Sequence, residues 1–411
     1  MGSRAAWIVI LTYNPCMIHR VLTARLKEAA AQLPVVTLTG PRQSGKTTLC
    51  RAAFPGKKYV NLEPLDTRDL ALSDPRGFLA EYSDGVILDE IENVPELLSY
   101  IQADVDEDPS LGRFILTGSQ QLAANRAIGQ TLAGRTAILH LLPFSLDERR
   151  QSEDWQEDLW VDVFRGAYPR VYDRHLDPVR WYADYITTYV ERDVRQVKEI
   201  GDLRAFRTFI TLAAGRTAQE VNLSSLGGDA GVSHNTARAW LGLLEASFIT
   251  TLLPAWHRNV RKQIIKAPKL HFIDTGVACS LLGIRDPDQL RSHPLRGALF
   301  ESWVAGEILK GLVHRGRQPD LKHYRESRGM EIDLVLQQAG ALHLVECKSS
   351  ATTHPSFFEP LSAIRDLIGA ASPETAVTSA LVYGGKESYP RRTIPVYSWG
   401  DIEKLSRRIA G

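Results

Sequence analysis

Residues 40–47, with the sequence Gly-Pro-Arg-Gln-Ser-Gly-Lys-Thr, constrain the fold of this chain more than any other segment. They fit the phosphate-binding pattern G-x-x-x-x-G-K-[ST], which is credible only between a strand and a helix. Residues 35–39 form a short β-branched run typical of a buried strand, and residues 48–53 can continue as a helix. The alternative is a glycine turn that carries Lys and Thr by chance. Strand, loop and helix together predict a nucleoside triphosphate site.

The residue types in this loop indicate how it would hold the ligand. Backbone N–H groups and the positive end of the following helix attract phosphate oxygens. Lys46 is expected to reach the β- and γ-phosphates, and Thr47 to hold Mg²⁺. The nucleotide-binding candidates are therefore Gly40, Pro41, Arg42, Gln43, Ser44, Gly45, Lys46, Thr47 and Thr48.

A second apolar strand, at residues 85–90, ends in two acids. Asp89 would hold Mg²⁺ through water, and Glu90 would polarise the attacking water. The alternative is a strand whose acidic end is only solvated. Downstream of the phosphate loop, this pair predicts that the nucleoside triphosphate is hydrolysed as well as bound.

Two further positions are expected to complete the reaction. A third apolar run leads into Gly118, Ser119 and Gln120, at the point where AAA+ ATPases place a polar sensor of the γ-phosphate; Ser119 is the first candidate and Gln120 the second. Arg135 precedes another apolar run, where AAA+ rings often carry an arginine that reaches the neighbouring subunit's nucleotide. Such an arginine contributes about 10³–10⁵ in rate in enzymes that use one. A surface arginine that caps a helix end is the alternative.

Composition excludes several classes of protein. The 411 residues carry a net charge of +1 with 24% charged residues, so the chain is neither disordered nor basic overall, and any nucleic-acid surface must be local. We expect no membrane span and no signal peptide, because the early apolar run is far too short. We also expect no zinc and a reduced, cytoplasmic location, because disulfide and metal-ligand spacings are absent from the cysteines, which are Cys16, Cys50, Cys279 and Cys347.

The expected fold class is α/β, with a P-loop AAA+ ATPase core, a helical lid, a winged-helix domain and a carboxy-terminal restriction-endonuclease-like α/β domain. The acidic stretch 147–158 is interpreted as the exit from the ATPase core. An aromatic stripe with helical spacing follows residue 178 and is expected to be core. The predicted boundaries are 1–16 (extension), 17–146 (ATPase core), 147–202 (helical lid and linker), 203–292 (winged-helix-like) and 293–411 (nuclease-like).

Residues 223–244 outline a helix-turn-helix in which Ser233 would cap the second helix. If this unit binds DNA, His234, Asn235 and Arg238 would face the groove. A basic stretch without acids follows and would contact phosphates through Arg258, Arg261, Lys262, Lys266 and Lys269. The alternative is a winged helix that serves only as a packing module.

Near the carboxy terminus, two alternating strands flank Ala339-Gly340. If these two residues form the hairpin loop, cross-strand partners have numbers that add up to 679, because 339 and 340 do. Asp333 then lies opposite Glu346, and Glu331 opposite Lys348, all on one face. Opposed carboxylates repel unless a cation lies between them, so Asp333 and Glu346 are candidate ligands of Mg²⁺ or Mn²⁺.

A third carboxylate, Glu301, is expected on the preceding helix. With Asp333, Glu346 and Lys348 it completes the pattern of PD-(D/E)xK nucleases, in which Lys348 would orient water or stabilise charge during phosphodiester hydrolysis. Two alternatives stay open. One is a polar hairpin face with a single salt bridge, and the other is a degenerate nuclease fold that binds DNA or supports assembly without cutting.

Together these motifs resemble a family of bacterial and archaeal ATPases that pair an AAA-type domain with a carboxy-terminal DUF4143 region. The resemblance implies ATP as the nucleotide and a homo-oligomer such as a hexameric ring. One departure is Ala167, which stands where a second glycine is usual. The resemblance covers nearly the whole chain from Met17 onward and is carried by residues 40–48, 88–91, 116–119, 132–135, 166–169, 189–193, 272–276 and 346–348.

We therefore expect a cytoplasmic ATPase that binds ATP and Mg²⁺ and uses hydrolysis to bind or remodel DNA, including branched or forked DNA. Its catalytic residues would be Lys46, Asp89, Glu90, Ser119 and Arg135. Two other functions stay open: an ATP-dependent, metal-dependent DNA nuclease, and a nucleotide-gated switch that binds a protein partner.

Overall fold

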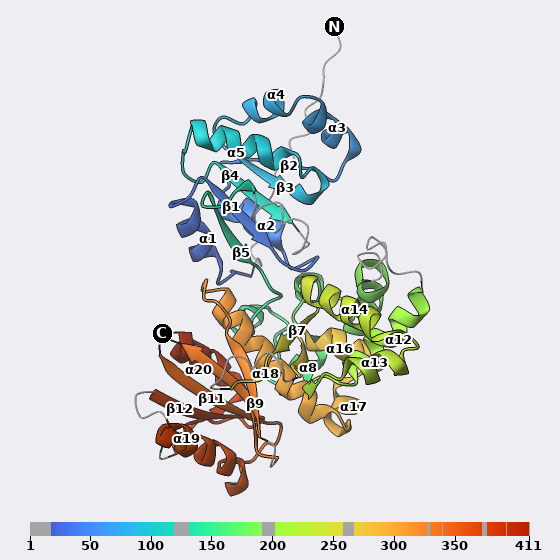
Figure 1. Ribbon diagram of the computed structural model, residues 1–411, viewed down its shortest axis with the longest axis vertical. Helices are drawn as coiled ribbons and strands as arrows, with labels where there is room; N and C mark the ends of the chain where they lie inside the picture. Colours follow the sequence, from blue (N-terminus) through green and yellow to red (C-terminus); the bar gives the residue numbers. More distant parts are fainter. Residues whose placement is uncertain are drawn as a thin grey trace.

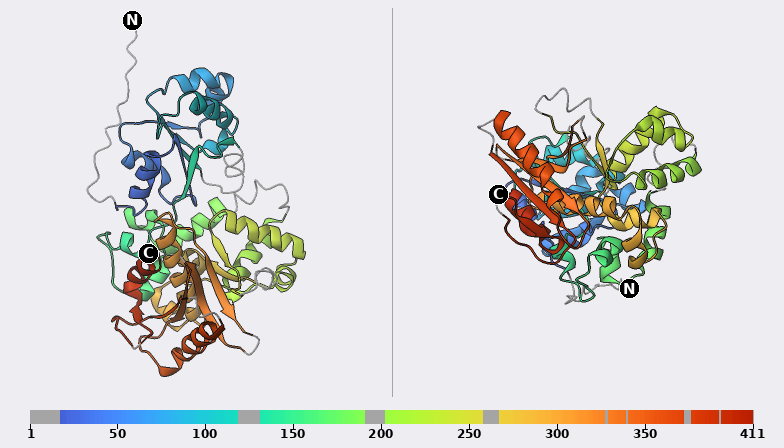
Figure 2. Two further views of the ribbon diagram at one scale, coloured as in Figure 1. Left: turned by 60° about the vertical axis from the view of Figure 1, so that its left-hand side comes forward. Right: turned by 90° about the horizontal axis from the view of Figure 1, so that it is seen from below.

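The computed structural model describes residues 18–118, 131–190, 202–257, 267–326, 329–338, 340–371, 376–391 and 393–410. It has three regions in chain order: a sheet region in blue to teal, a mainly helical region in green to yellow, and a second sheet region in orange to red (Figure 1). The first region stands above the other two, which lie side by side (Figure 2). Among the described residues, no helix is long and apolar enough to cross a membrane.

The first region is built on a parallel five-stranded sheet with the strand order β2-β3-β4-β1-β5. Its strands are β1 (Val35–Thr39), β2 (Lys58–Asn61), β3 (Val86–Asp89), β4 (Phe114–Gly118) and β5 (Thr136–His140). Its helices are α1 (Thr23–Ala30), α2 (Lys46–Ala53), α3 (Leu65–Ser73), α4 (Pro75–Ala80), the 3-10 turn η1 (Ile91–Asn93) and α5 (Leu97–Glu107).

The three central strands, β1, β3 and β4, are buried on both faces, which is why their sequences are nearly continuous apolar runs. On one face, Phe78 of α4 and Ile101 of α5 belong to one apolar cluster with strand residues. On the other face, Leu26 of α1 and Leu49 of α2 belong to a second cluster. Because the strands are parallel, their carboxyl ends meet at one edge, where open α/β sheets bind ligands.

The middle region consists of short helices around a small antiparallel sheet with the order β6-β8-β7. The helices are α7 (Leu146–Arg149), α8 (Leu159–Arg165), α9 (Pro169–Asp173), α10 (Pro178–Tyr185), the π-helical turn η2 (Ile186–Val190), α12 (Leu203–Ala214), α13 (Leu223–Asp229), α14 (His234–Ala246), α16 (Thr275–Leu281) and α17 (Pro287–Ser292). The strands are β6 (Gln219–Glu220), β7 (Thr250–Leu253) and β8 (Lys269–Phe272). As the aromatic spacing predicted, Tyr182 and Tyr185 of α10 are buried in the core.

Two of the sequence motifs, residues 166–169 and 272–276, meet in this region, although about 100 residues separate them. The Asp274 carboxylate accepts a hydrogen bond from the Ala167 N–H (2.7 Å). The Tyr182 ring lies against the glycines of both motifs, so that a Cβ on Gly166 or Gly276 would lie 2.0 Å or 2.4 Å from Tyr182 atoms. These two motifs therefore pack against each other. This packing explains their residue types without any role in catalysis.

The third region contains a mixed sheet with the order β13-β12-β11-β10-β9. Helices α18 and α20 contact one face of this sheet, and α19 contacts the other. The elements are α18 (Arg296–Val313), β9 (Leu321–Arg325), β10 (Glu331–Gln338), β11 (Ala341–Lys348), the 3-10 turn η3 (Pro355–Phe357), α19 (Glu359–Ala371), β12 (Ala376–Tyr383), β13 (Val396–Ser398), the 3-10 turn η4 (Trp399–Asp401) and α20 (Ile402–Ala410).

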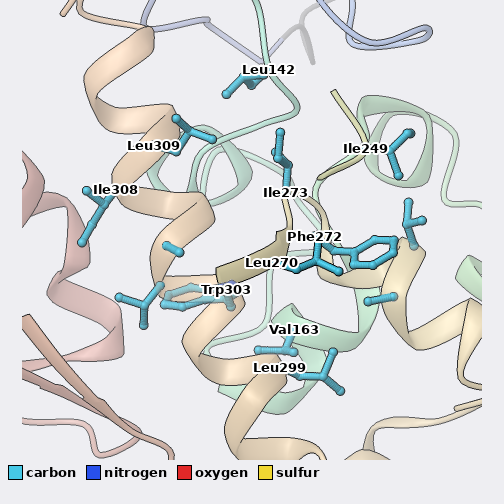
Figure 3. Close-up of a cluster of buried hydrophobic side chains, with 14 of the residues drawn as sticks. Leu142, Val163, Ile249, Leu270, Phe272, Ile273, Leu299, Trp303, Ile308 and Leu309 are labelled. Atoms are coloured by element: carbon cyan, nitrogen blue, oxygen red, sulfur yellow. The ribbon is translucent and has the colours of Figure 1, made fainter. Parts of the chain in front are cut away.

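Helix α18 packs against the middle region as well as against its own sheet. Figure 3 shows Leu299 and Trp303 of α18 beside Val163 of α8 and Leu270 and Phe272 of β8, all within one apolar cluster. The elements on the two sides of the predicted boundary at residue 292 therefore share one core.

The acidic stretch 147–158 is not simply a solvated exit from the first region, because α7 within it is buried. Arg149 is 1% exposed and donates hydrogen bonds to Asp162 (2.6 and 2.8 Å) and to Glu307 of α18 (2.9 Å). Lys310 donates to the same Glu307 carboxylate (2.8 Å). Although burial opposes ionisation of Glu307, Arg149 and Lys310 lower its pKa to about 2. Helix α7 is thus held against α18 by a buried network of ion pairs.

His314, directly after α18, ties the same two regions together. It is buried, and its Nε2 accepts a hydrogen bond from the Leu142 N–H (3.2 Å). Burial lowers the pKa of His314 to about 4; Glu148, 3.9 Å away, and Glu307 oppose this shift, whereas Arg20 and Lys310 add to it. An unfolded histidine titrates near ~6.5, so between that pH and about 4 the unfolded state binds more protons and His314 reduces stability.

We expect the variant His314→Gln to lose less stability than the wild type on acidification. Glutamine keeps an acceptor for the Leu142 N–H but does not titrate. The measurement is the difference between the urea midpoints of the two proteins at about pH 7 and about pH 4.5. Titrating groups that do not interact with His314 contribute equally to both proteins and cancel in this difference. If acidification lowered the urea midpoint of His314→Gln as much as that of the wild type, the expectation would be contradicted.

Candidate functional site

The phosphate-loop prediction is confirmed in its local structure: β1 leads into the loop, and α2 begins at Lys46. Gly40 is required because its φ is +152° and a Cβ there would lie 2.2 Å from the Leu141 carbonyl oxygen. Within the described part of the chain, the buried Ser44 Oγ and Gln43 Oε1 have no hydrogen-bond partner. Unpaired polar atoms beside this loop fit a site completed by a polar ligand.

Lys46 is folded back over its own loop. Its Nζ donates to the carbonyl oxygens of Gly40 and Pro41, both at 3.0 Å. Burial lowers the pKa of Lys46, while the nearby acids Glu90, Glu92 and Asp89 oppose that shift. The ammonium thus lies in the field of the acids at the end of β3, as the order of the motifs predicted.

Asp89 is the centre of a hydroxyl cluster at the carboxyl ends of the strands. It accepts hydrogen bonds from the hydroxyls of Thr47 (2.9 and 3.1 Å), Tyr59 (2.8 Å) and Thr117. Oxygen donors of this kind suit Mg²⁺. Tyr59 and Thr117 did not emerge from the sequence as site residues. Thr117 could have been found from its place at the end of a strand beside β1, but Tyr59 carries no such signal.

Glu90 follows in a left-handed conformation (φ 59°), which is uncommon for a residue with a side chain and clusters at functional sites. Its backbone N–H points to the Thr117 hydroxyl (3.4 Å). Burial, followed by the charge and hydrogen bond of Glu92, raises the pKa of Glu90 to about 8. Burial and the neighbouring acids thus make Glu90 more basic than an ordinary carboxylate, the direction that suits a proton acceptor.

Arg135, another predicted ATPase residue, does not lie beside this loop. Ser119 and Gln120 lie outside the described residues. Arg135 precedes β5, whose first residue pairs with Val35, the first residue of β1. It therefore lies at the opposite end of the strands from the phosphate loop, and it pairs with Asp106 (2.5 and 2.9 Å). If Arg135 contacts a nucleotide, that nucleotide would have to be bound to another subunit.

The carboxy-terminal hairpin has the predicted register over its inner half, from Gln338 opposite Ala341 to Leu334 opposite Val345. Beyond Leu334 the structure differs from the expected regular ladder. The pairing of β10 with β9 shifts between Ile332 and Val335, and the Asp333 carboxylate accepts the Cys347 N–H (2.8 Å). The Asp333 side chain thus accepts the N–H of Cys347 in place of a backbone carbonyl. The predicted direct pairing of Asp333 with Glu346 in a regular ladder is therefore not observed.

The predicted carboxylates are nevertheless gathered together, with a lysine on each side. Lys269 Nζ lies 2.7 Å from Glu301 and 3.6 Å from Asp333, and Lys348 Nζ lies 2.5 Å from Glu346. Burial and the charge of Asp333 raise the pKa of Glu301 well above its usual range, and raise that of Glu346 to about 8. In the described ranges, no group of three or more His, Cys, Asp or Glu side chains has the arrangement of a metal site.

The position of Lys269 corrects the interpretation of the basic stretch. The charge pattern predicts Lys269 in a phosphate-binding wing, but it is 6% exposed and its ammonium lies among the carboxylates. Charge composition alone could not distinguish a solvated lysine from one drawn into an acidic cluster. Arg258, Arg261, Lys262 and Lys266 lie outside the described residues.

On the helix-turn-helix outline, the capping prediction is confirmed: the Ser233 hydroxyl accepts the Thr236 N–H at the start of α14 (3.1 Å). His234, Asn235 and Arg238 are exposed, and their spacing of three and four residues places them on one side of the helix. Buried Ala237 and Trp240 hold the other side of α14 in the core.

Comparisons with known proteins divide the chain in three. A family model described as an AAA domain matches residues 32–149, a domain of unknown function (DUF8612) matches residues 156–288, and a domain of unknown function (DUF4143) matches residues 296–401. Two mycobacterial relatives, Uncharacterized protein Rv2008c of Mycobacterium tuberculosis and Uncharacterized protein Mb2031c of Mycobacterium bovis, are each 30% identical over 383 residues. In both cases the match covers 91% of this chain and 82% of the relative.

Solved structures resemble parts of the chain. A Walker-type ATPase of Pyrococcus abyssi is 17% identical with a TM-score of 0.42, over 63% of this chain and 94% of that protein. AMPPCP-bound DnaA from Aquifex aeolicus is 10% identical with a TM-score of 0.29, over 55% of this chain and 86% of that one.

Proposed function

Because the chain belongs to the family of ATPases that join an AAA domain to a carboxy-terminal DUF4143 domain, we propose that it hydrolyses ATP at Lys46, Thr47, Asp89 and Glu90 and uses this reaction to bind or remodel DNA. The observation that carries the site assignment is the contact of the Thr47 hydroxyl with both Asp89 oxygens, 3.1 and 2.9 Å. It joins the two motifs, 42 residues apart, into one oxygen-rich site beside Lys46.

Each residue has a role that its position supports. Thr47 and Asp89 would hold Mg²⁺, which when bound neutralises charge on the phosphates. Lys46 would exchange its two carbonyl acceptors for phosphate oxygens. Glu90 would take the proton of the attacking water, and Asp89 would keep its place through the hydroxyls of Tyr59 and Thr117.

Assembly of several copies would complete the site. We propose that Arg135 leaves Asp106 and contacts the nucleotide of a neighbouring copy in a homo-oligomer. Its position away from its own chain's phosphate loop supports a role between subunits. Ser119, with Gln120 as the second choice, remains our proposal for the γ-phosphate sensor.

The DNA contact is proposed for the unit made of α12, β6, α13, α14, β7 and β8, in the manner of a winged helix. The support is the exposed row of His234, Asn235 and Arg238 on the second helix of a helix-turn-helix. Arg258, Arg261 and Lys262 would extend the contact along the phosphates.

We expect Arg238→Ala to weaken binding of fluorescently labelled duplex and forked DNA. If Arg238 contacts one phosphate, the slope of log K against log salt should decrease by about one unit, because one counterion fewer is released. Fluorescence anisotropy over a range of salt concentrations measures this slope. An unchanged slope and affinity would remove α14 from the DNA interface, and Arg180→Ala, on an exposed arginine of α10, is the matched control.

A second candidate function, metal-dependent cleavage of DNA, is favoured by one observation: Glu301, Asp333 and Glu346 are gathered around Lys269 and Lys348. Asp333→Asn should then abolish cutting of DNA in Mg²⁺ or Mn²⁺ while ATP hydrolysis stays at the wild-type rate. Cutting that survives this substitution would refute the candidate. Absence of cutting by the wild type would leave the cluster as a charged joint between β8, α18 and the sheet.

A further inference from the structure

A buried arginine lies directly behind the phosphate loop. Arg20 precedes α1 and is 6% exposed, with its guanidinium against the Phe144 ring (4.8 Å). Its Nη1 donates to the Ser44 carbonyl oxygen (2.7 Å), its Nη2 donates to the Leu142 carbonyl oxygen (2.6 Å), and its Nε lies 3.2 Å from Glu148. Both Nη atoms thus donate hydrogen bonds to backbone carbonyls, while Nε faces Glu148 as an ion pair without a hydrogen bond.

The contact with Ser44 sets the direction of a backbone N–H in the loop. In a trans peptide the C=O of one residue and the N–H of the next point in opposite directions. Arg20 holds the Ser44 carbonyl on the inner side of the loop, so the Gly45 N–H points to the other side. Phosphate loops bind phosphate through N–H groups that converge on the ligand, so the orientation of this peptide affects affinity directly.

Two buried residues hold Arg20 in turn: Glu148 of α7 and His314, directly after α18. Glu148, 0% exposed, contacts Arg20 and accepts the Val21 N–H (2.7 Å). His314 accepts the Leu142 N–H, while the Leu142 carbonyl accepts from Arg20. The phosphate loop is therefore connected to the carboxy-terminal region by direct contacts between buried groups.

We propose that Arg20 is a positioning residue of the nucleotide site, and that Glu148 of α7 and His314 after α18 support it, so that affinity for the triphosphate depends on the carboxy-terminal region. This inference rests on the proposed ATP site and extends it to a residue outside the ATP-binding motifs. Arg20 itself touches the loop from behind, so it acts on the phosphates only through the Ser44–Gly45 peptide.

The test is titration of the full chain with a methylanthraniloyl derivative of ATP, together with the thermal midpoint without nucleotide. Arg20→Met should raise the Kd by about 10–100-fold, the equivalent of losing one or two charged hydrogen bonds. Arg20→Lys should be intermediate, since an ammonium keeps the charge but not the forked geometry. Lys27→Met, on an exposed lysine of α1, is the control and should bind like the wild type.

The outcomes separate positioning from folding. A lower thermal midpoint with an unchanged Kd in Arg20→Met would overturn the proposal, because a merely structural residue behaves in that way. If Arg20→Met does not fold, His314→Leu and His314→Gln decide. Leucine removes the acceptor for Leu142 and should raise the Kd several-fold, whereas glutamine should not; equal values would overturn the proposal. Failure of the wild type to bind the ATP derivative would instead refute the nucleotide site itself.

Discussion

Replacement of Glu90 with glutamine is expected to lower the rate of ATP hydrolysis by about 10²–10⁴-fold, the usual contribution of a general base. The amide has nearly the shape of the carboxylate but cannot accept the proton of the attacking water. Because Lys46, Thr47 and Asp89 remain, binding of ATP should persist within a few-fold. The measurements are release of phosphate under single-turnover conditions and titration with a fluorescent ATP derivative.

The matched control for this experiment is Glu96→Gln. Glu96 is an exposed acid just before α5, six residues after Glu90, and it makes no contact with the site that would explain an effect. Its variant should hydrolyse ATP at the wild-type rate. Hydrolysis by Glu90→Gln at the rate of Glu96→Gln would show that another group accepts the proton.

The largest loss of stability is expected from Arg149→Met. Removal of this guanidinium leaves the buried carboxylates of Asp162 and Glu307 without their main partner, and an uncompensated buried charge typically costs about 3–5 kcal/mol. Lys310 still contacts Glu307, but Asp162 keeps only the indole N–H of Trp303 (2.8 Å). Urea unfolding at constant pH measures the change in free energy.

Arg407→Met is the control for this second prediction. Arg407 also joins two acids, Asp147 and Glu403, but its side chain is 64% exposed. Surface pairs of this kind contribute about 0–1 kcal/mol, so the control should be nearly as stable as the wild type. Equal midpoints for Arg149→Met and Arg407→Met would contradict the role given to the network between α7 and α18.

The sequence predicted the ATP site well where the information is local. Residues 40–47 lie between a strand and a helix, and Asp89 and Glu90 end a buried strand, so pattern and context coincide. Tyr59 could not be found in the same way, and Thr117 only from its place at the end of a strand. Both reach Asp89 only because β2 and β4 flank β3, and this strand order depends on packing across the whole sheet.

In the carboxy-terminal cluster, too, the sequence predicts local features but not contacts between distant segments. The turn at Gly340 predicted the inner register of the hairpin, because a short loop fixes its nearest pairs. The register shift near Asp333 lies in the pairing of β10 with β9, and the hairpin sequence alone does not indicate it. Lys269 reaches Glu301 from a strand of another region, and no local pattern reports such a contact. Arg20 was overlooked for the same reason, since its partners Leu142 and Glu148 are more than 120 residues away.

The most direct test of the central claim is steady-state ATP hydrolysis by the purified protein without DNA and with single-stranded, duplex and forked DNA, beside Lys46→Ala. The account predicts hydrolysis that one form of DNA stimulates, and no activity in Lys46→Ala. Hydrolysis that no form of DNA changes, with ATP binding intact, would contradict the DNA role and favour a nucleotide-gated switch that binds a protein partner.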